Sequence, residues 1–128
     1  PIIHHPAYSG GFVSLGVSGV ADYLQLGLLP RIFGADMPIF VSYGGRFTFT
    51  EKQCKRISSY IKRPMGLMKA ACPAPGGGVT DARLNELVEL YGNDTMFLVG
   101  GDMFRRGPDI EANMSYFVER LTKLSERT

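Results

Sequence analysis

Residues 70–80 read Ala-Ala-Cys-Pro-Ala-Pro-Gly-Gly-Gly-Val-Thr, an apolar run that ends in three glycines just before a helical pattern begins. A strand that ends at glycines before a helix leaves backbone N–H groups free to face an anion. Residues 97–102, Phe-Leu-Val-Gly-Gly-Asp, repeat this arrangement in shorter form. The glycines concerned are Gly76, Gly77, Gly78, Gly100 and Gly101. They predict one shared phosphate site, and the alternative is that they only make tight strand-to-helix turns.

Composition limits the classes of protein that fit. The chain has 128 residues, enough for one domain, and its 45% hydrophobic and 20% charged residues are typical of a globular fold. A net charge of +2 is too small to indicate a nucleic-acid partner. No apolar segment approaches the roughly 18 residues that span a bilayer. Two cysteines make no disulfide framework, so we expect a reduced, cytoplasmic protein. Because the first residue is Pro1 inside an apolar run, we expect a piece of a longer protein.

Strand-like and helical patterns alternate along the whole chain. A capping box at Thr50 and Gln53 marks one helix start, and Pro30 lies inside another helical pattern, either in a first turn or at a break between two short helices. Strands are expected at 1–6, 37–42, 66–72 and 95–99, helices at 20–33, 51–63, 80–91 and 109–124, and loops at 8–19, 43–49 and 100–108. Repeated β-α units with apolar strands predict a parallel α/β sheet. Four units are half of an eight-stranded β/α barrel, and a flavodoxin-like open sheet is the alternative.

Three further side chains are candidates for the chemistry. His4 and His5 are adjacent on a strand and point to opposite faces, so they are poorly placed to share a metal. One of them can carry a proton or bind phosphate, and the alternative is one buried and one exposed histidine. Arg46, in the glycine-bearing loop 43–49, can close over a substrate anion or stand as a solvated surface cation. No acidic cluster follows a strand, so any magnesium ligands are expected outside this chain.

Five short motifs, taken in order, point to a family. They are His-His-Pro-Ala-Tyr-Ser-Gly at 4–10, Phe-Gly-Ala-Asp at 33–36, Tyr-Gly-Gly-Arg-Phe at 43–47, Pro-Ala-Pro-Gly-Gly-Gly at 73–78 and Leu-Val-Gly-Gly at 98–101. The chain resembles the C-terminal part of the RuBisCO large chain, and most closely the RuBisCO-like proteins that do not fix carbon dioxide. The resemblance covers nearly all of residues 1–128.

This resemblance implies strands five to eight of a (β/α)8 TIM barrel, lacking the N-terminal domain and strands one to four, and normally found in a homodimer. Gly76, Gly77, Gly100 and Gly101 match the family's backbone donors to a substrate phosphate. His4 and His5 match a His-Arg pair that contacts the reacting centre and the other phosphate. Arg46 matches the mobile loop-six lysine of true RuBisCO.

The departures from the family pattern make carboxylation doubtful. Arg46 replaces the lysine, apolar Ile39 and Phe40 replace a histidine region, and Pro75 replaces a serine. The family's magnesium ligands lie on a strand that this chain lacks. The resemblance favours decarboxylation of an oxo-sugar-acid phosphate through a magnesium-stabilised enediolate. The alternatives are an enolase or isomerase acting on methylthio-sugar phosphates, as in methionine salvage, or a non-catalytic phosphate-binding fragment.

Overall fold

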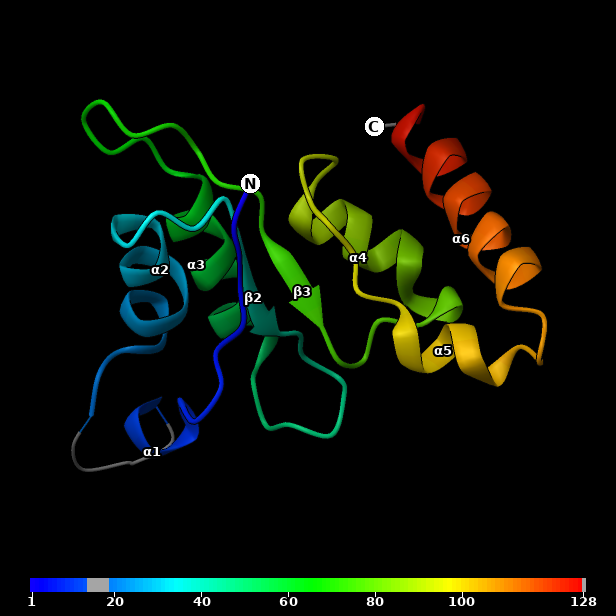
Figure 1. Ribbon diagram of the computed structural model, residues 1–128, viewed down its shortest axis with the longest axis horizontal. Coiled ribbons are helices and arrows are strands. Elements are labelled where there is room, and N and C mark those ends of the chain that lie inside the picture. Colours follow the sequence, from blue (N-terminus) through cyan, green and yellow to red (C-terminus); the bar gives the residue numbers. More distant parts are fainter. Residues whose placement is uncertain (14–18, 128) are drawn as a thin grey trace.

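A computed structural model describes residues 1–13 and 19–127 of the chain. Three parallel strands form its sheet in the order β1-β2-β3, and they are β1 (Ile3–His4), β2 (Met37–Val41) and β3 (Ala74–Gly76). All three run in the same direction, so the segments that follow them gather along the lower edge in Figure 1. This parallel α/β arrangement confirms the predicted class, and it places every candidate loop on one edge of the sheet.

The third strand lies later in the chain than predicted. Residues 66–72 do not form it; β3 begins at Ala74 and lies between Pro73 and Gly77. The predicted bounds of this strand are therefore wrong. The carbonyls of Pro73 and Pro75 accept hydrogen bonds from the N–H groups of Met96 and Leu98, at 2.9 and 3.1 Å.

The fourth predicted strand, at 95–99, is reduced to a parallel bridge between Gly76 and Leu98. In a β-strand, the N–H and C=O groups of one residue point toward the same neighbouring strand. Pro73 and Pro75 therefore present carbonyls to this segment but no N–H groups, and each proline removes one ladder hydrogen bond. The segment still runs beside β3 as a strand would, without a full ladder.

Helices follow the strands as expected, with three differences. Residues 10–13 of the expected loop 8–19 form α1 (Gly10–Val13), while 14–18 lie outside the described residues. The helix expected at 20–33 divides into a π-helix, η1 (Tyr23–Leu28), and α2 (Leu29–Ile32), with Pro30 in the first turn of α2. The expected loop 100–108 contains α5 (Gly100–Arg105). The remaining helical elements are α3 (Glu51–Lys62), η2 (Asp81–Arg83), α4 (Leu84–Tyr91) and α6 (Ile110–Ser125).

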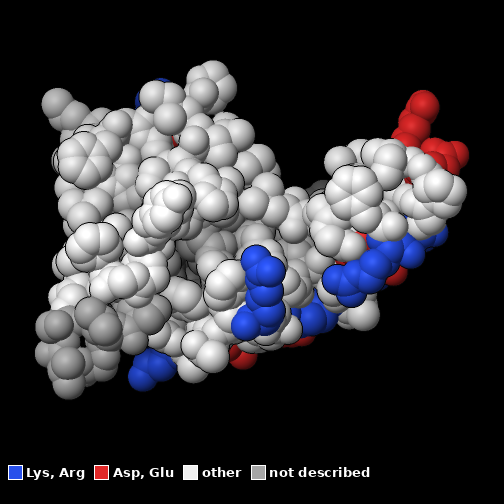
Figure 2. Space-filling model, turned by 60° about the horizontal axis from the view of Figure 1, so that its bottom comes forward, with Lys and Arg blue, Asp and Glu red and all other residues white. Residues whose placement is uncertain are grey.

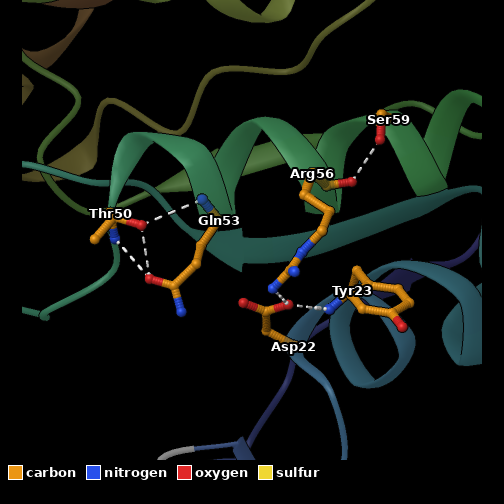
Figure 3. A network of polar contacts seen from close by, with 6 residues as sticks. All are labelled: Asp22, Tyr23, Thr50, Gln53, Arg56 and Ser59. Carbon is orange, nitrogen blue, oxygen red and sulfur yellow. Dashed lines mark hydrogen bonds and ion pairs between the residues drawn. The ribbon is translucent and has the colours of Figure 1, made fainter.

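The start of α3 shows why this sequence forms a helix here (Figure 3). The Gln53 N–H donates to the Thr50 hydroxyl at 3.3 Å, and the Thr50 N–H donates to the Gln53 side-chain oxygen at 2.9 Å, which confirms the capping box. Farther along α3, Arg56 forms an ion pair at 2.6 Å with buried Asp22, which also accepts from the Tyr23 N–H. The cap fixes the end of the 43–49 loop, and the ion pair holds η1 against α3.

The core lies between the sheet and the helices that follow it. Helical spacing predicts one apolar face on α3 and one on α4, and both faces are buried; they comprise Cys54, Ile57, Ile61, Leu84, Leu87, Val88 and Tyr91. Helical spacing places Leu24, Leu28 and Ile32 on one face, but Leu24 and Leu28 are only half-buried and Ile32 is exposed. The π-turn shifts full burial to Leu26 and Gly27.

On α6, helical spacing predicts an inward stripe of Ile110, Met114, Phe117, Val118 and Leu121. Phe117 is buried, but other residues of this stripe are not. Ile110, Met114 and Val118 are 42%, 45% and 56% exposed. Over the described part of the chain, no helix combines the length and the apolar character needed to span a membrane.

Candidate functional site

The two glycine segments meet at one edge of the sheet. Gly76 ends β3 and pairs with Leu98, two residues before α5 begins at Gly100. A direct hydrogen bond also joins the segments beyond the glycines, because the Asp81 N–H donates to the Asp102 carboxylate at 2.9 Å. The structure thus brings together the glycines that the sequence indicated, although they are some 24 residues apart.

Residues 76–78, here called the glycine loop, have a backbone that favours glycine. Gly77 and Gly78 have φ values of +75° and +73°, which side chains of L-residues rarely adopt. A Cβ on Gly76 would lie 3.1 Å from the Leu98 side chain, whereas one on Gly77 would meet nothing nearer than 4.0 Å. The loop is therefore built from backbone, and its polar groups are backbone N–H and C=O groups.

Gly100 and Gly101 form the first turn of α5 and are exposed. The first N–H groups of a helix have no carbonyl partner within the helix, so they are available to a ligand. A Cβ on Gly100 would meet no atom within 4 Å, and one on Gly101 only the end of the Arg105 side chain at 3.6 Å. The folded chain itself leaves open space in front of both residues, which is the space an anion needs.

Arg46 lies in the loop that faces the glycine loop. Residues 43–49, here called the Arg46 loop, follow β2, and a Cβ on Gly45 would come within 2.9 Å of the Gly78 nitrogen. The two backbones are in direct contact. The Arg46 side chain itself is exposed, with its guanidinium 4.9 Å from the centre of the Phe47 ring. In Figure 2, which turns this edge of the molecule forward, Lys and Arg side chains lie across the face.

His4 and His5 lie farther away, on the other side of β2 from the glycine loop. His4 is half-buried at the end of β1, and among the described residues its Nδ1 atom is buried without a hydrogen-bond partner. Burial, and then the neighbouring His5, lower the pKa of His4. His5 is exposed. The structure therefore shows one inward and one outward histidine, and it brings neither into contact with the glycines.

Sequence reasoning missed Arg83, which connects the two loops. Its Nη1 atom donates to the Tyr43 carbonyl at 2.7 Å and to the Gly78 carbonyl at 3.0 Å. Its guanidinium also lies over the Tyr43 ring at 4.4 Å and pairs with Glu86 at 2.9 Å. The Tyr43 hydroxyl donates to Glu86 as well; burial and this acidic partner raise the pKa of Tyr43 to about 12. No local motif marks an arginine for such a role.

The described residues do not supply a metal site. Within residues 1–13 and 19–127, no group of three or more His, Cys, Asp and Glu side chains lies close enough to hold a metal ion. Asp102 accepts the Asp81 N–H through Oδ2 and belongs to no such group. The expectation that magnesium ligands lie outside this chain stays a prediction.

Comparison with known proteins identifies the relatives of this chain. No protein-family profile matches it. Ribulose bisphosphate carboxylase-like protein 1 of Rhodopseudomonas palustris is 34% identical over 116 residues, which cover 91% of this chain and 30% of that protein. A solved structure of a RuBisCO-like protein from Alicyclobacillus acidocaldarius matches 100% of this chain and 32% of its own, with a TM-score of 0.86 and 27% identity. The chain is a homologue of the RuBisCO-like proteins. Its similarity covers the C-terminal part of the large-chain fold, as the motifs predicted.

Two further RuBisCO-like relatives are named as enzymes. 5-Methylthioribulose-1-phosphate isomerase of Rhodospirillum rubrum is 31% identical over 88% of this chain and 30% of that protein. 2,3-Diketo-5-methylthiopentyl-1-phosphate enolase of Exiguobacterium sibiricum is 33% identical over 79% of this chain and 25% of that protein. The chain spans about a third or less of the length of the curated relatives it matches.

Proposed function

We propose that the natural protein carrying this chain is an enolase or isomerase of a phosphorylated keto-sugar, and that this chain supplies its phosphate-binding edge. The observation that carries the proposal is the pairing of Gly76 with Leu98, which sets two glycine segments side by side at the ends of parallel strands. The names of the isomerase and enolase relatives support the reaction class. They favour it over the decarboxylation that the resemblance implied.

We also propose that the chain forms one half of a β/α barrel. The parallel strand order, the β-α alternation and the match to about a third of each longer relative support this arrangement. The other half would then provide the expected magnesium ligands, and a second subunit would complete a homodimer. Both remain predictions from the resemblance.

Within the site, each part of this chain has a distinct task. Backbone N–H groups of the glycine loop and of Gly100 and Gly101 would hold the substrate phosphate, because open backbone donors at a helix start favour an anion. Arg46 would close over the bound keto-sugar from the facing loop. His4, half-buried with a free Nδ1, would contact the substrate from β1 once the rest of the barrel encloses it.

The test adds a charge where a side chain fits without strain. Gly101 is exposed, has no left-handed backbone, and begins a helix turn, so Gly101→Asp leaves the fold intact. Gly101→Asn is the matched control, since it has the same shape without the charge. In the natural protein, we expect Gly101→Asp to weaken inorganic phosphate binding at least tenfold and Gly101→Asn to weaken it about threefold or less.

Gly101→Asp should also lose more activity than Gly101→Asn. The substrates to assay are 5-methylthioribulose 1-phosphate and 2,3-diketo-5-methylthiopentyl 1-phosphate. Equal phosphate affinity in the two variants would show that the glycines do not bind the anion. Turnover of neither substrate by the unaltered natural protein would refute the proposed reaction.

A further inference from the structure

The contacts of Arg83 join two loops that are remote in sequence. The two carbonyls that its Nη1 atom binds belong to Tyr43, 40 residues away, and to Gly78, 5 residues away. Tyr43 begins the Arg46 loop and Gly78 ends the glycine loop. One guanidinium therefore fixes the base of one loop to the end of the other.

The surrounding backbone is shaped around this guanidinium. A Cβ on Gly44 would lie 2.4 Å from Arg83 Nη1, so a side chain there would displace the guanidinium, and the φ of +75° at Gly44 is one that glycine adopts readily. A Cβ on Gly78 would lie 2.7 Å from the Gly45 nitrogen. The position of Arg83 thus depends on Gly44, and the close approach of the two loops depends on Gly45 and Gly78.

The charge of Arg83 is balanced where it stands. Its side chain is 21% exposed, and Glu86, three residues on, accepts from both its Nε and its Nη2 atoms. Glu86 also accepts from the Tyr43 hydroxyl, so this carboxylate binds both Arg83 and the first residue of the Arg46 loop. Hydrogen bonds from a charged donor to carbonyls are stronger than neutral ones. Arg83 is therefore held in one geometry and is not available as a free surface cation.

We propose that Arg83 is a positioning residue that sets where Arg46 stands relative to the phosphate held by the glycine loop. It acts by fixing the first residue of the Arg46 loop against the last residue of the glycine loop. The substrate-linked part of this proposal rests on the proposed function. The structural part, that Arg83 restrains the Arg46 loop, is testable without any substrate.

Limited proteolysis measures the restraint directly. Trypsin cleaves after arginine, and the exposed Arg46 offers it the bond to Phe47. In the natural protein, we expect Arg83→Met to raise the rate of cleavage at this bond about tenfold, because two charge-assisted hydrogen bonds no longer oppose local opening. Arg63→Met is the matched control, since Arg63 also lies over a tyrosine ring, at 4.8 Å from the centre of Tyr60, but far from this loop. Arg83→Lys keeps a cation, so its cleavage rate should lie between those of Arg83→Met and the unaltered protein. It replaces Arg83→Met in the test if that variant does not fold. Unchanged cleavage in both Arg83 variants overturns the proposal.

A double-mutant cycle tests whether the effect passes through Arg46. If Arg83 acts by positioning Arg46, then Arg83→Met in an Arg46→Met background should reduce kcat/KM by less than about threefold, although Arg83→Met alone reduces it at least tenfold. A purely structural role would give the same loss in both backgrounds, and that result would refute the positioning role. Failure of the Gly101→Asp test would count against the phosphate site and leave the cleavage result unaffected, so the two proposals fail separately.

Discussion

The contact between the Arg46 loop and the glycine loop can be tested with two neighbouring glycines. Gly77 and Gly78 have nearly the same φ, +75° and +73°, so alanine meets the same backbone strain at both. They differ in what a Cβ would meet. At Gly78 it would lie 2.7 Å from the Gly45 nitrogen and 3.0 Å from the Tyr43 carbonyl oxygen, whereas at Gly77 it would lie 4.0 Å from Val41.

These distances give an expected difference in stability. Left-handed backbone costs an L-residue about 1–2 kcal/mol, and both variants bear that cost. Gly78→Ala also forces two backbones apart, and a backbone cannot turn aside as a flexible side chain can. Overpacking of this kind costs about 1–3 kcal/mol more. We therefore expect Gly77→Ala to lower the free energy of unfolding by about 1 kcal/mol and Gly78→Ala by about 3 kcal/mol.

Urea denaturation of the natural protein and both variants measures the difference. Far-UV circular dichroism, which reports on the helices, is a suitable signal. The same samples can be assayed for trypsin cleavage after Arg46, which should increase in Gly78→Ala and hardly change in Gly77→Ala. Equal destabilisation by the two substitutions would mean that the loops do not touch at Gly45 and Gly78, and the account of the site would be wrong.

Two further predictions concern Thr50 and Asp81, which lie outside the two loops of the site. Thr50→Ala removes the hydroxyl that accepts from the Gln53 N–H and should lower the free energy of unfolding by about 1 kcal/mol, whereas Thr50→Ser should be nearly neutral in the same urea titration. The Tyr116 hydroxyl first, and then Arg120, lower the pKa of Asp81. A depressed carboxyl pKa contributes stability that is present above the unfolded-state value and is lost as the pH falls through the folded-state value. Asp81→Asn should therefore flatten the decline in the thermal midpoint on acidification below about pH 4, and an unchanged acid profile would contradict the assignment.

The sequence predicts those parts of the fold that depend on neighbouring residues. The capping box needs only residues three apart, and the glycine loop needs only a local φ above zero, so both are found where the pattern placed them. The exposed stripe of α6 shows the opposite case. Periodicity indicates that Ile110, Met114 and Val118 share a face with Phe117, but whether anything packs on that face is decided elsewhere in the molecule. The shift of β3 is similar, since the use of Pro73 and Pro75 carbonyls depends on a partner segment about 23 residues on.

Arg83 shows why a site can be located from a sequence while its construction cannot. It is one of 14 Lys and Arg residues, and its spacing from Glu86 is ordinary for a helix surface. The role of Arg83 depends on the fold, which places the carbonyls of Tyr43 and Gly78, from separate β-α units, within hydrogen-bond distance of one guanidinium. The glycines mark the proposed anion-binding edge in the sequence because their backbone requirement is local. The position of Arg83 depends on both loops at once. Its role is therefore visible only in the folded chain.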